Sequence, residues 1–183
     1  MTIFTQAGLS LRLVEKKDLS TLLLLRNDPS TWSQLTDPLP ITERDQSIWM
    51  SSISLRTGRF YAVACNPTNS FIGLVRMDLH DPQNRNIRVG LDVLSGLRGR
   101  GYGFRIYGTI LSYCFRELNV HRVWLQVVHT NKRAQRLYGK LGFREEGRMR
   151  DAVFRGGRYI DYVMMSILED EYESAVVQGP CVP

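Results

Sequence analysis

One short segment rich in glycine and arginine, residues 98–103, most strongly constrains what this chain can fold into and bind. It reads Arg98-Gly99-Arg100-Gly101-Tyr102-Gly103 and lies between an apolar, strand-like run and a segment with helical spacing. Its glycines allow the backbone to curl with N–H groups pointing inward, and a following helix adds a positive N-terminal end. The segment therefore predicts a loop that holds a phosphate or pyrophosphate, and a basic turn without a ligand is the alternative.

A second motif, residues 131–143, follows the loop after a β-branched run. It opens with Asn131, a residue type that favours helix N-caps, and Gly142 is placed to end the helix. Tyr138 lies two helical turns after Asn131, so both side chains project to the same side. The Tyr138 hydroxyl is a candidate general acid, and the alternative is a packing role on an amphipathic helix.

Together the two motifs resemble those of the GNAT family of acetyl-CoA-dependent N-acetyltransferases. Arg98 to Gly103 matches the family's R/Q-x-x-G-x-G/A loop, and Asn131 to Tyr138 matches its N-x-x-[SA]-x-x-[LV]-Y helix start. The exit Leu141-Gly142-Phe143 also agrees, and the resemblance extends from Leu9 to about Tyr172. It implies a single α/β (α+β) domain with a mixed, largely antiparallel sheet flanked by helices. In that fold two central strands splay apart and the cofactor enters the gap.

The resemblance also implies how acetyl-CoA, the expected co-substrate, is held. The loop grips the pyrophosphate, the strand edge before the loop pairs with the pantetheine arm, and Tyr138 protonates the departing thiolate. A main-chain N–H of that strand edge stabilises the developing oxyanion. The implied cofactor-binding residues are Asp92, Val93, Leu94, Arg98, Gly99, Arg100, Gly101, Tyr102, Gly103, Phe104 and Asn131.

The general base is the part of the family pattern that this chain lacks. Many relatives carry Glu before the glycine loop, where this chain has Arg88. The ribosomal-protein branch carries Glu where this chain has Gln126. Asp78, His80 and Asp92 remain as candidate bases, and a chain of waters to solvent is a further alternative.

Hydrophobic periodicity predicts one domain over residues 1–173 and a frayed tail over residues 174–183. A Gly156-Gly157 pair predicts a hairpin turn, and a Thr42 capping box predicts the start of a helix. Other helices are expected at 18–27, 106–118 and 131–140. Strands are expected at 9–14, 60–65, 71–79, 87–93, 120–128, 144–154 and 159–168.

The composition, 43% hydrophobic and 23% charged, is that of an ordinary soluble protein. The apolar run Leu22 to Leu25 is too short to cross a bilayer, and Thr2 to Thr5 lacks the features of a secretion signal. We therefore expect a cytoplasmic protein. Cys65, Cys114 and Cys181 are scattered and fit neither a disulfide framework nor a zinc site, so no metal is expected. The place of Cys114 on an apolar helix face predicts a packing role.

The net charge of +6 is unevenly spread, because residues 98–158 hold 14 basic and 4 acidic side chains, a local net charge of +10. Most of these basic residues are arginines, which favour an anionic ligand. Nucleic acid is a competing but less favoured partner.

The acceptor is predicted from residues before and after the two motifs. The segment Arg26-Asn27-Asp28-Pro29 resembles that of the branch that acetylates nucleotide-linked amino sugars. The low number of acidic residues, 18, disfavours a polyamine as the acceptor. We expect a primary amine of a small metabolite, such as a nucleotide-linked amino sugar. A protein or peptide N-terminus of the ribosomal-protein type is the first alternative. A non-catalytic CoA- or nucleic-acid-binding module is the second alternative. The sequence is compatible with a homodimer.

Overall fold

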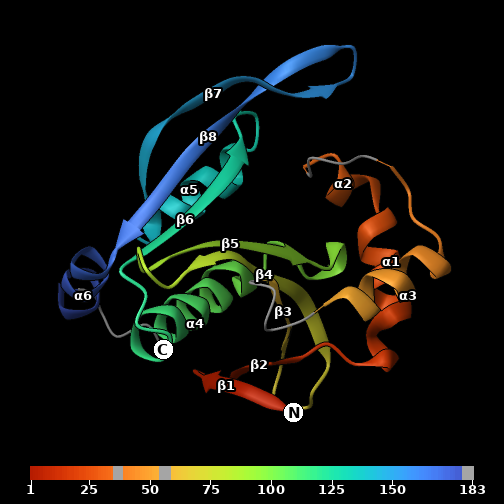
Figure 1. Ribbon diagram of the computed structural model, residues 1–183, viewed down its shortest axis with the longest axis horizontal. Helices are drawn as coiled ribbons and strands as arrows, with labels where there is room; N and C mark the ends of the chain where they lie inside the picture. The colour runs from red at the N-terminus through yellow and green to blue at the C-terminus, as the bar shows by residue number, and fades with distance from the viewer. Residues whose placement is uncertain (35–38, 54–58, 179–183) are drawn as a thin grey trace.

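The computed structural model describes residues 1–34, 39–53 and 59–178. Its strands form one eight-stranded sheet in the order β1-β2-β3-β4-β5-β6-β8-β7 (Figure 1). The strands are β1 (Thr2–Gln6), β2 (Leu9–Leu13), β3 (Arg59–Cys65), β4 (Phe71–Asp81), β5 (Asn86–Val93), β6 (Arg122–Val128), β7 (Arg144–Arg155) and β8 (Arg158–Leu168). β5 and β6 are parallel and the other described neighbours are antiparallel, so the predicted mixed, largely antiparallel sheet is confirmed.

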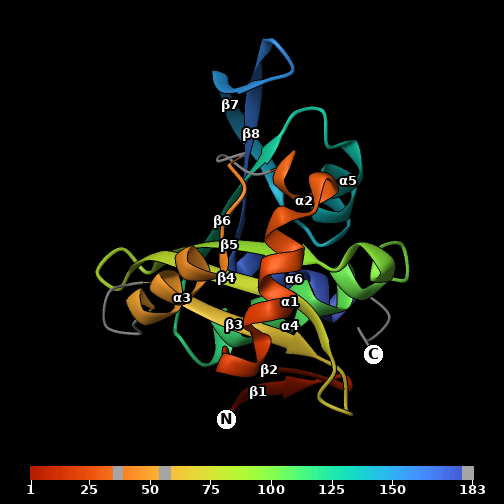
Figure 2. The same ribbon diagram turned by 90° about the vertical axis from the view of Figure 1, so that its right-hand side faces the viewer.

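The helices cover both faces of the sheet. They are α1 (Leu19–Asn27), α2 (Pro29–Trp32), α3 (Glu43–Ser52), α4 (Tyr102–Arg116), α5 (Lys132–Lys140) and α6 (Glu169–Gln178). Figure 2 shows α1 in front of the sheet with α4 behind it. The Thr42 capping box that starts α3 is present as predicted, with Thr42 and Asp45 bonding each other's main-chain N–H.

The core lies between α4 and the sheet face that carries alternate residues of β4 and β5. Ile106, Ile110 and Cys114 recur on one side of α4 and are fully buried against Val75 and Met77 of β4. Burial of each large apolar side chain contributes about 1.5–3 kcal/mol, so this layer supplies much of the folding free energy. The predicted packing role of Cys114 is confirmed. The opposite sheet face is left for α1 to α3 and for the site.

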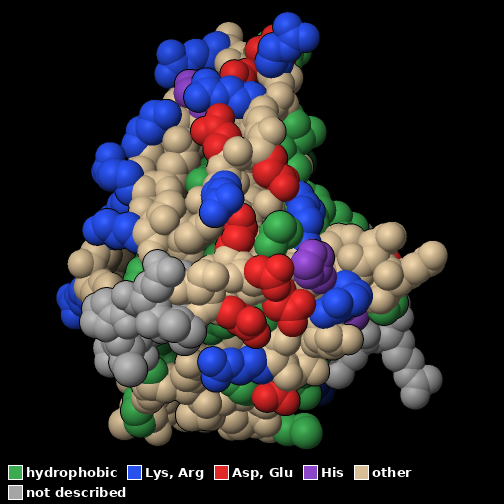
Figure 3. Space-filling model, turned by 90° about the vertical axis from the view of Figure 1, so that its left-hand side faces the viewer, with side chains coloured by type: hydrophobic (Ala, Val, Ile, Leu, Met, Phe, Trp, Pro, Cys, Tyr) green, Lys and Arg blue, Asp and Glu red, His purple; other side chains and the backbone are tan. Residues whose placement is uncertain are grey.

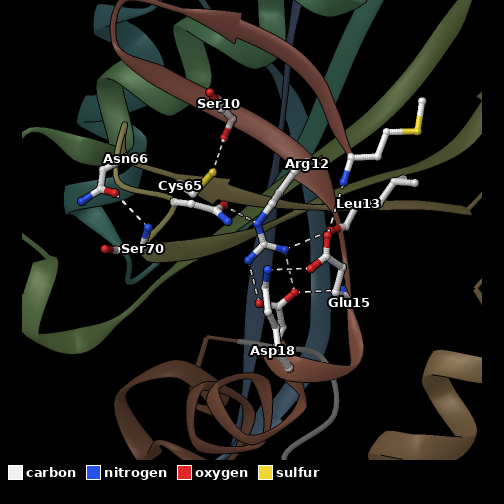
Figure 4. A network of polar contacts seen from close by, with 11 residues as sticks. Ser10, Arg12, Leu13, Glu15, Asp18, Cys65, Asn66 and Ser70 are labelled. Carbon is white, nitrogen blue, oxygen red and sulfur yellow. Dashed lines mark hydrogen bonds and ion pairs between the residues drawn. The ribbon is translucent and has the colours of Figure 1, made fainter.

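A buried ion pair fixes where α1 begins (Figure 4). Arg12 of β2 donates two hydrogen bonds of 2.7 Å to Asp18, and both side chains are buried. Asp18 also accepts a 2.8 Å bond from the Glu15 N–H, which closes a 3-10 turn over Lys16–Asp18. The polar residue that the sequence marks as the helix start therefore ties the first turn to the sheet.

β5 and β6 pair over only a short stretch and then separate. Their register joins Asn86 to Arg122, Ile87 to Val123 and Arg88 to Trp124, and no further described pair follows. Beyond this point β6, β8 and β7 turn away from the rest of the sheet (Figure 1). The predicted splay of two central strands is confirmed, and it opens the sheet beside the glycine loop.

Two elements differ from the sequence prediction. β1 was not predicted, because it is a short edge strand with little buried apolar surface. The tail that the sequence predicts to be frayed begins inside a helix, because α6 runs from Glu169 to Gln178 and includes residues 174–178. The buried ring of Tyr172 stacks on Phe115 with 4.9 Å between centroids, which docks this helix. Residues 179–183, with Cys181, lie outside the described residues.

Candidate active site

The glycine loop has the conformation that its composition predicts. Gly99 and Gly101 have φ values of +86° and +81°, in the left-handed region that L side chains rarely adopt. A Cβ placed on Gly101 would meet nothing within 4 Å, so space lies open beside the loop. α4 begins at Tyr102, and Gly101 brings no side chain to cap it. The loop and the helix end thus present main-chain N–H donors that fit a pyrophosphate.

A cleft of about 450 Å³ lies between this loop, the end of β5 and α5, and we call it the loop cleft. Leu94, Arg100 and Tyr102 lie outside its lining, although all three are described. The predicted site residues that do line it are Asp92, Val93, Arg98, Gly99, Gly101, Gly103, Phe104, Asn131 and Tyr138. Most of the predicted set is therefore brought together around one cleft.

Arg98 lines the loop cleft, but its guanidinium donates hydrogen bonds to other residues of the protein. Nε donates to the Val93 carbonyl at 2.8 Å, and the two terminal nitrogens donate to Ser30 at 2.6 Å and Thr31 at 2.5 Å. Ser30 and Thr31 belong to α2, so Arg98 holds this short helix against the end of β5. The structure thus gives the arginine of the loop motif a role in shaping the cleft.

The free edge of β5 exposes main-chain N–H donors. The residues that carry them differ from the predicted set of Asp92, Val93 and Leu94. The Leu94 N–H donates to the Ile72 carbonyl of β4 at 3.0 Å, so it faces away from the cleft. Because N–H groups alternate sides along a strand, Asp92 also directs its N–H to β4. Leu91 and Val93 direct theirs to the unpaired edge. The main-chain N–H on the cleft side of β5 is therefore that of Leu91 and not that of Leu94.

Tyr138 projects from α5 into the space between the diverging strands. Its hydroxyl accepts a 3.3 Å hydrogen bond from the Tyr107 hydroxyl of α4, and the two rings meet edge to face. This bond leaves the proton of Tyr138 available to donate. Burial raises the pKa of Tyr138 above its ordinary value of 10.0, so the hydroxyl holds its proton at neutral pH.

Asn131 caps α5 as predicted. Its side-chain oxygen accepts a 3.1 Å bond from the Ala134 N–H. The same residue lines the loop cleft, so capping and a contact with a bound arm are compatible. Gly142, with φ +95°, follows the helix end as the sequence predicts.

Two further cavities border β4 and β5. The sheet cavity, about 150 Å³, is lined by β4 to β6 residues that include Arg76, Asp78, Arg88 and Gln126. The helix cavity, about 290 Å³, is lined by α1, α3 and the sheet, with Arg26, Asp45, Trp49, Tyr61, Arg76 and Asp92 among its residues. Six described residues line both the loop cleft and the sheet cavity: Gln34, Leu91, Asp92, Tyr107, Asn131 and Tyr138. The loop cleft and the sheet cavity therefore adjoin at these six residues.

The three candidate bases are placed very differently. Asp78 lines the sheet cavity but accepts bonds of 2.6 and 2.8 Å from Arg88, which occupies the position where many relatives carry Glu. His80 is exposed and lines none of the three cavities. Asp92 lines all three, and its carboxylate lies 3.4 Å from Arg76. The position of Gln126 in the sheet cavity likewise puts an amide where a carboxylate was sought.

The site residues that sequence reasoning missed include Gln34, Arg76, Leu91 and Tyr107. Tyr107 lies on the apolar face of α4 with the spacing of a core residue. The sequence pattern therefore assigns it to the core and does not indicate that its hydroxyl belongs to the site. The alternation of β4 does carry a signal for Arg76, because it shares a strand face with Leu74 and Asp78 rather than with buried Val75 and Met77.

The surface charge is segregated rather than uniformly basic. Figure 3 shows Lys and Arg side chains along one edge and the top of the face it presents, with Asp and Glu side chains in the middle. Helix α6 carries Glu169, Asp170 and Glu171 in its first turn. The exposed basic residues of α5 lie beside the loop cleft, since Arg133 lines it. This distribution favours a local anionic ligand over a nucleic-acid strand.

The structure thus combines a splayed sheet, a glycine loop at its opening and a half-buried tyrosine, Tyr138, at the junction, as the resemblance to acyl-transferring enzymes predicts. The family model described as an acetyltransferase (GNAT) domain matches residues 9–144, and the chain belongs to this family. It is a GNAT N-acetyltransferase with acetyl-CoA as co-substrate, so the family prediction is confirmed.

Individual relatives cover nearly the whole chain. A spermidine N(1)-acetyltransferase of Vibrio cholerae is 28% identical over 90% of this chain and 95% of its own length. An L-amino acid N-acetyltransferase of Escherichia coli is 24% identical over 85% and 95%. The crystal structure of spermidine N-acetyltransferase from Vibrio cholerae with CoA and spermine superposes with a TM-score of 0.86, at 26% identity over 92% and 99%. These relatives support transfer to an amine and give no support to the amino-sugar prediction.

Within the described ranges 1–34, 39–53 and 59–178, no helix is long and apolar enough to cross a membrane. The same ranges contain no group of three or more His, Cys, Asp and Glu side chains arranged to hold a metal ion.

Proposed function

We propose that the enzyme transfers the acetyl group to the primary amine of a small molecule that enters through the sheet and helix cavities. The observation that carries the proposal is the meeting of the loop cleft and the sheet cavity at Tyr138. A thioester held along the β5 edge and an amine on the far side then approach each other across the same residues. Cavities of about 150 and 290 Å³ suit a small acceptor.

The donor side of the site works mainly through the main chain. The loop N–H groups bind the pyrophosphate, and Leu91 and Val93 offer N–H donors to the pantetheine arm and the thioester oxygen. Donors fixed in a strand need no reorganisation when negative charge develops on that oxygen, which is why such contacts accelerate acyl transfer.

Tyr138 is the proposed general acid. The amine nitrogen forms a bond to the thioester carbon, the C–S bond breaks, and the departing thiolate takes the Tyr138 proton. Tyr107 donates to the Tyr138 oxygen and so favours the anion that remains. The proton lost by the amine leaves through water or through Asp92, which is the carboxylate that lines all three cavities.

The identity of the acceptor is tested by a panel of amines with acetyl-CoA, with free thiol release as the readout. The panel contains amino acids, a nucleotide-linked amino sugar, spermidine and short peptides, because the relatives and the sequence point to different members. The Tyr138→Phe variant is the test of the acid, and Tyr159→Phe, an exposed tyrosine of β8, is the matched control. Turnover of peptides alone would contradict a small acceptor. Absence of turnover with every amine, while CoA still raises the melting temperature, would contradict the catalytic proposal.

A further inference from the structure

The acceptor side of the site contains an arginine whose hydrogen-bonding capacity is largely unused. Arg76 of β4 lines both the sheet cavity and the helix cavity, and its side chain is 35% exposed. Its Nε is buried without a hydrogen-bond partner among the described residues. The Asp92 carboxylate lies 3.4 Å from Nη2, which is long for a charge-assisted hydrogen bond. Among the residues that the structure describes, this guanidinium, with its five donors, thus makes one long ion pair.

Other arginines in the same fold show what a fully used guanidinium looks like. Arg88, on the neighbouring strand, donates bonds of 2.6 and 2.8 Å to Asp78. Arg12 donates two bonds of 2.7 Å to Asp18. Both pairs are bidentate and complete, whereas the pair of Arg76 with Asp92 is not. Arg76 is thus arranged to accept a second anion as a ligand.

Gly90 of β5 makes room for this arginine. The two residues are directly opposite each other in the β4–β5 register. A Cβ added to Gly90 would lie 3.0 Å from Nη2 and 3.2 Å from Cζ of Arg76. The missing side chain therefore lets the guanidinium rest against the β5 backbone, and an alanine at Gly90 would shift it by a few tenths of an ångström.

We infer that Arg76 binds a carboxylate or phosphate that the acceptor carries within a few bonds of its amine, while Asp92 receives the amine. The inference rests on the proposed function and names its substrate class, an amine that carries its own negative charge. Asp92 lies at the junction with Tyr138, and Arg76 lies beside Asp92 and away from the loop cleft. The two opposite charges are thus ordered from the acetyl group outward, amine first and anion second. Planar, two-point recognition of such an anion is what a guanidinium does best.

The same cavities are poorly suited to a polyamine. Arg26 and Arg76 both line the helix cavity, where a second ammonium group would lie. Asp45, a carboxylate of that cavity, already accepts bonds of 2.8 and 2.7 Å from Thr42 in the α3 cap. Asp92 also lines this cavity, but it receives the amine that reacts, so a second ammonium beside the two guanidinium groups would find no further carboxylate without a partner in the described lining.

The test compares amines that differ only in the anion. Glycine is paired with glycinamide, phosphoethanolamine with ethanolamine, and spermidine is the cationic arm. Wild-type enzyme is expected to favour the anionic member of at least one pair by about 10- to 100-fold in kcat/KM, the factor for one charge-assisted bond. The pair that shows the preference tells carboxylate from phosphate. Preference for spermidine or for the neutral member of both pairs would overturn the inference.

Two independent changes then test Arg76 itself. Arg76→Gln removes the positive charge. Gly90→Ala shifts the guanidinium of Arg76 and keeps its charge. Arg76→Lys is the milder variant if Arg76→Gln folds poorly. Each is expected to lower the ratio of kcat/KM for the anionic amine to that for the neutral amine, Arg76→Gln by most of the preference and Gly90→Ala by part of it. Arg116→Gln, at the exposed end of α4, is the matched control. An undiminished preference in Arg76→Gln would overturn the inference.

Failure of the inference is kept separate from failure of the proposed function by a binding measurement. Titration calorimetry of the enzyme saturated with CoA, which has no acetyl group to transfer, reports acceptor binding alone. Tighter binding of the anionic amine that Arg76→Gln abolishes supports the inference even where no transfer is seen, and only the catalytic proposal then fails. Transfer to neutral and anionic amines at equal rates, with equal binding, overturns the inference and leaves the acetyltransferase activity standing.

Discussion

The hydroxyl groups of Tyr107 and Tyr138 lie 3.3 Å apart where the loop cleft meets the sheet cavity. Tyr107 is buried and donates, so the proton of Tyr138 is directed to the space between β5 and β6. The pair forms because α4 and α5 each bring one ring to the gap that the diverging strands leave. The relationship supports the proposed role of Tyr138 as the general acid, with Tyr107 as its positioning residue, and each role predicts a different effect of substitution.

Tyr138→Phe is expected to lower kcat by roughly 10- to 1,000-fold, because the general acid is lost. The dissociation constant of CoA should change little, since the loop grips the other end of the molecule. Steady-state thiol release with a saturating amine measures the first quantity, and calorimetry measures the second. Unchanged kcat, where chemistry limits the rate, would return Tyr138 to a packing role.

Tyr107→Phe is expected to lower kcat by about tenfold, the value of a single hydrogen bond that stabilises the tyrosinate. The pH profile separates this positioning role from a purely structural one. Because burial raises the pKa of Tyr138 above 10, the wild-type rate should rise through neutral pH as the amine loses its proton, and should not fall for want of the acid below about pH 10. Loss of the Tyr107 bond raises that pKa further, so the alkaline limb should move upward. An identical alkaline limb of the pH–rate profile in the wild-type enzyme and in Tyr107→Phe would contradict the role of Tyr107 as a positioning residue.

The sequence predicts the local geometry of the glycine loop and of the start of α5, and it does so for a physical reason. Glycines at positive φ and an Asn N-cap are local requirements, so Gly99, Gly101 and Asn131 can be identified from neighbours in the chain. Leu94 was misplaced because the direction of its N–H depends on the β4 register, which pairs it with Ile72. Elements without such local marks were harder. β1 buries little, and the start of α6 carries only an acidic first turn.

The acceptor side depends on contacts between distant segments, and it was largely missed. Arg76 and Gly90 are fourteen residues apart and meet only through the β4–β5 register. The prediction from the 18 acidic residues, that a polyamine is disfavoured as acceptor, stays a prediction, and composition alone does not show which arginine lines the acceptor side. The three candidate bases were equivalent in sequence and became distinct only when Arg88 was seen to engage Asp78.

Replacing Gly101 and Gly103 by Val is expected to abolish the rise in melting temperature that acetyl-CoA gives the wild-type protein. Gly101 has a positive φ, and a Cβ on Gly103 would lie 3.2 Å from Leu137, so the variant should also start from a lower melting temperature. Gly147→Ala is the control, because its added Cβ meets nothing within 4 Å. A full ligand-induced shift in the double variant, measured by calorimetry, would show that the loop does not hold the cofactor.

No single carboxylate or histidine is expected to prove indispensable as the base. Asp78→Asn, Asp92→Asn and His80→Ala should each retain measurable activity, with Asp92→Asn the most impaired because Asp92 lines all three cavities. The rate should still rise with pH as more of the amine becomes neutral. Complete loss of turnover in one variant that folds and binds CoA would identify that residue as the base.

The buried Arg12–Asp18 pair should dominate the stability of the N-terminal part of the fold. Asp18→Asn leaves the Arg12 guanidinium, 4% exposed, without its charged partner, so the free energy of unfolding should fall by about 3–5 kcal/mol. Glu145→Gln, which breaks the exposed pair with Arg148, is the matched control and should cost less than about 1 kcal/mol. Urea unfolding followed by circular dichroism measures both. Equal losses in the two variants would mean that burial of the Arg12–Asp18 pair is not what makes it matter, and that α1 is held to the sheet by its apolar contacts through Leu22 and Leu25.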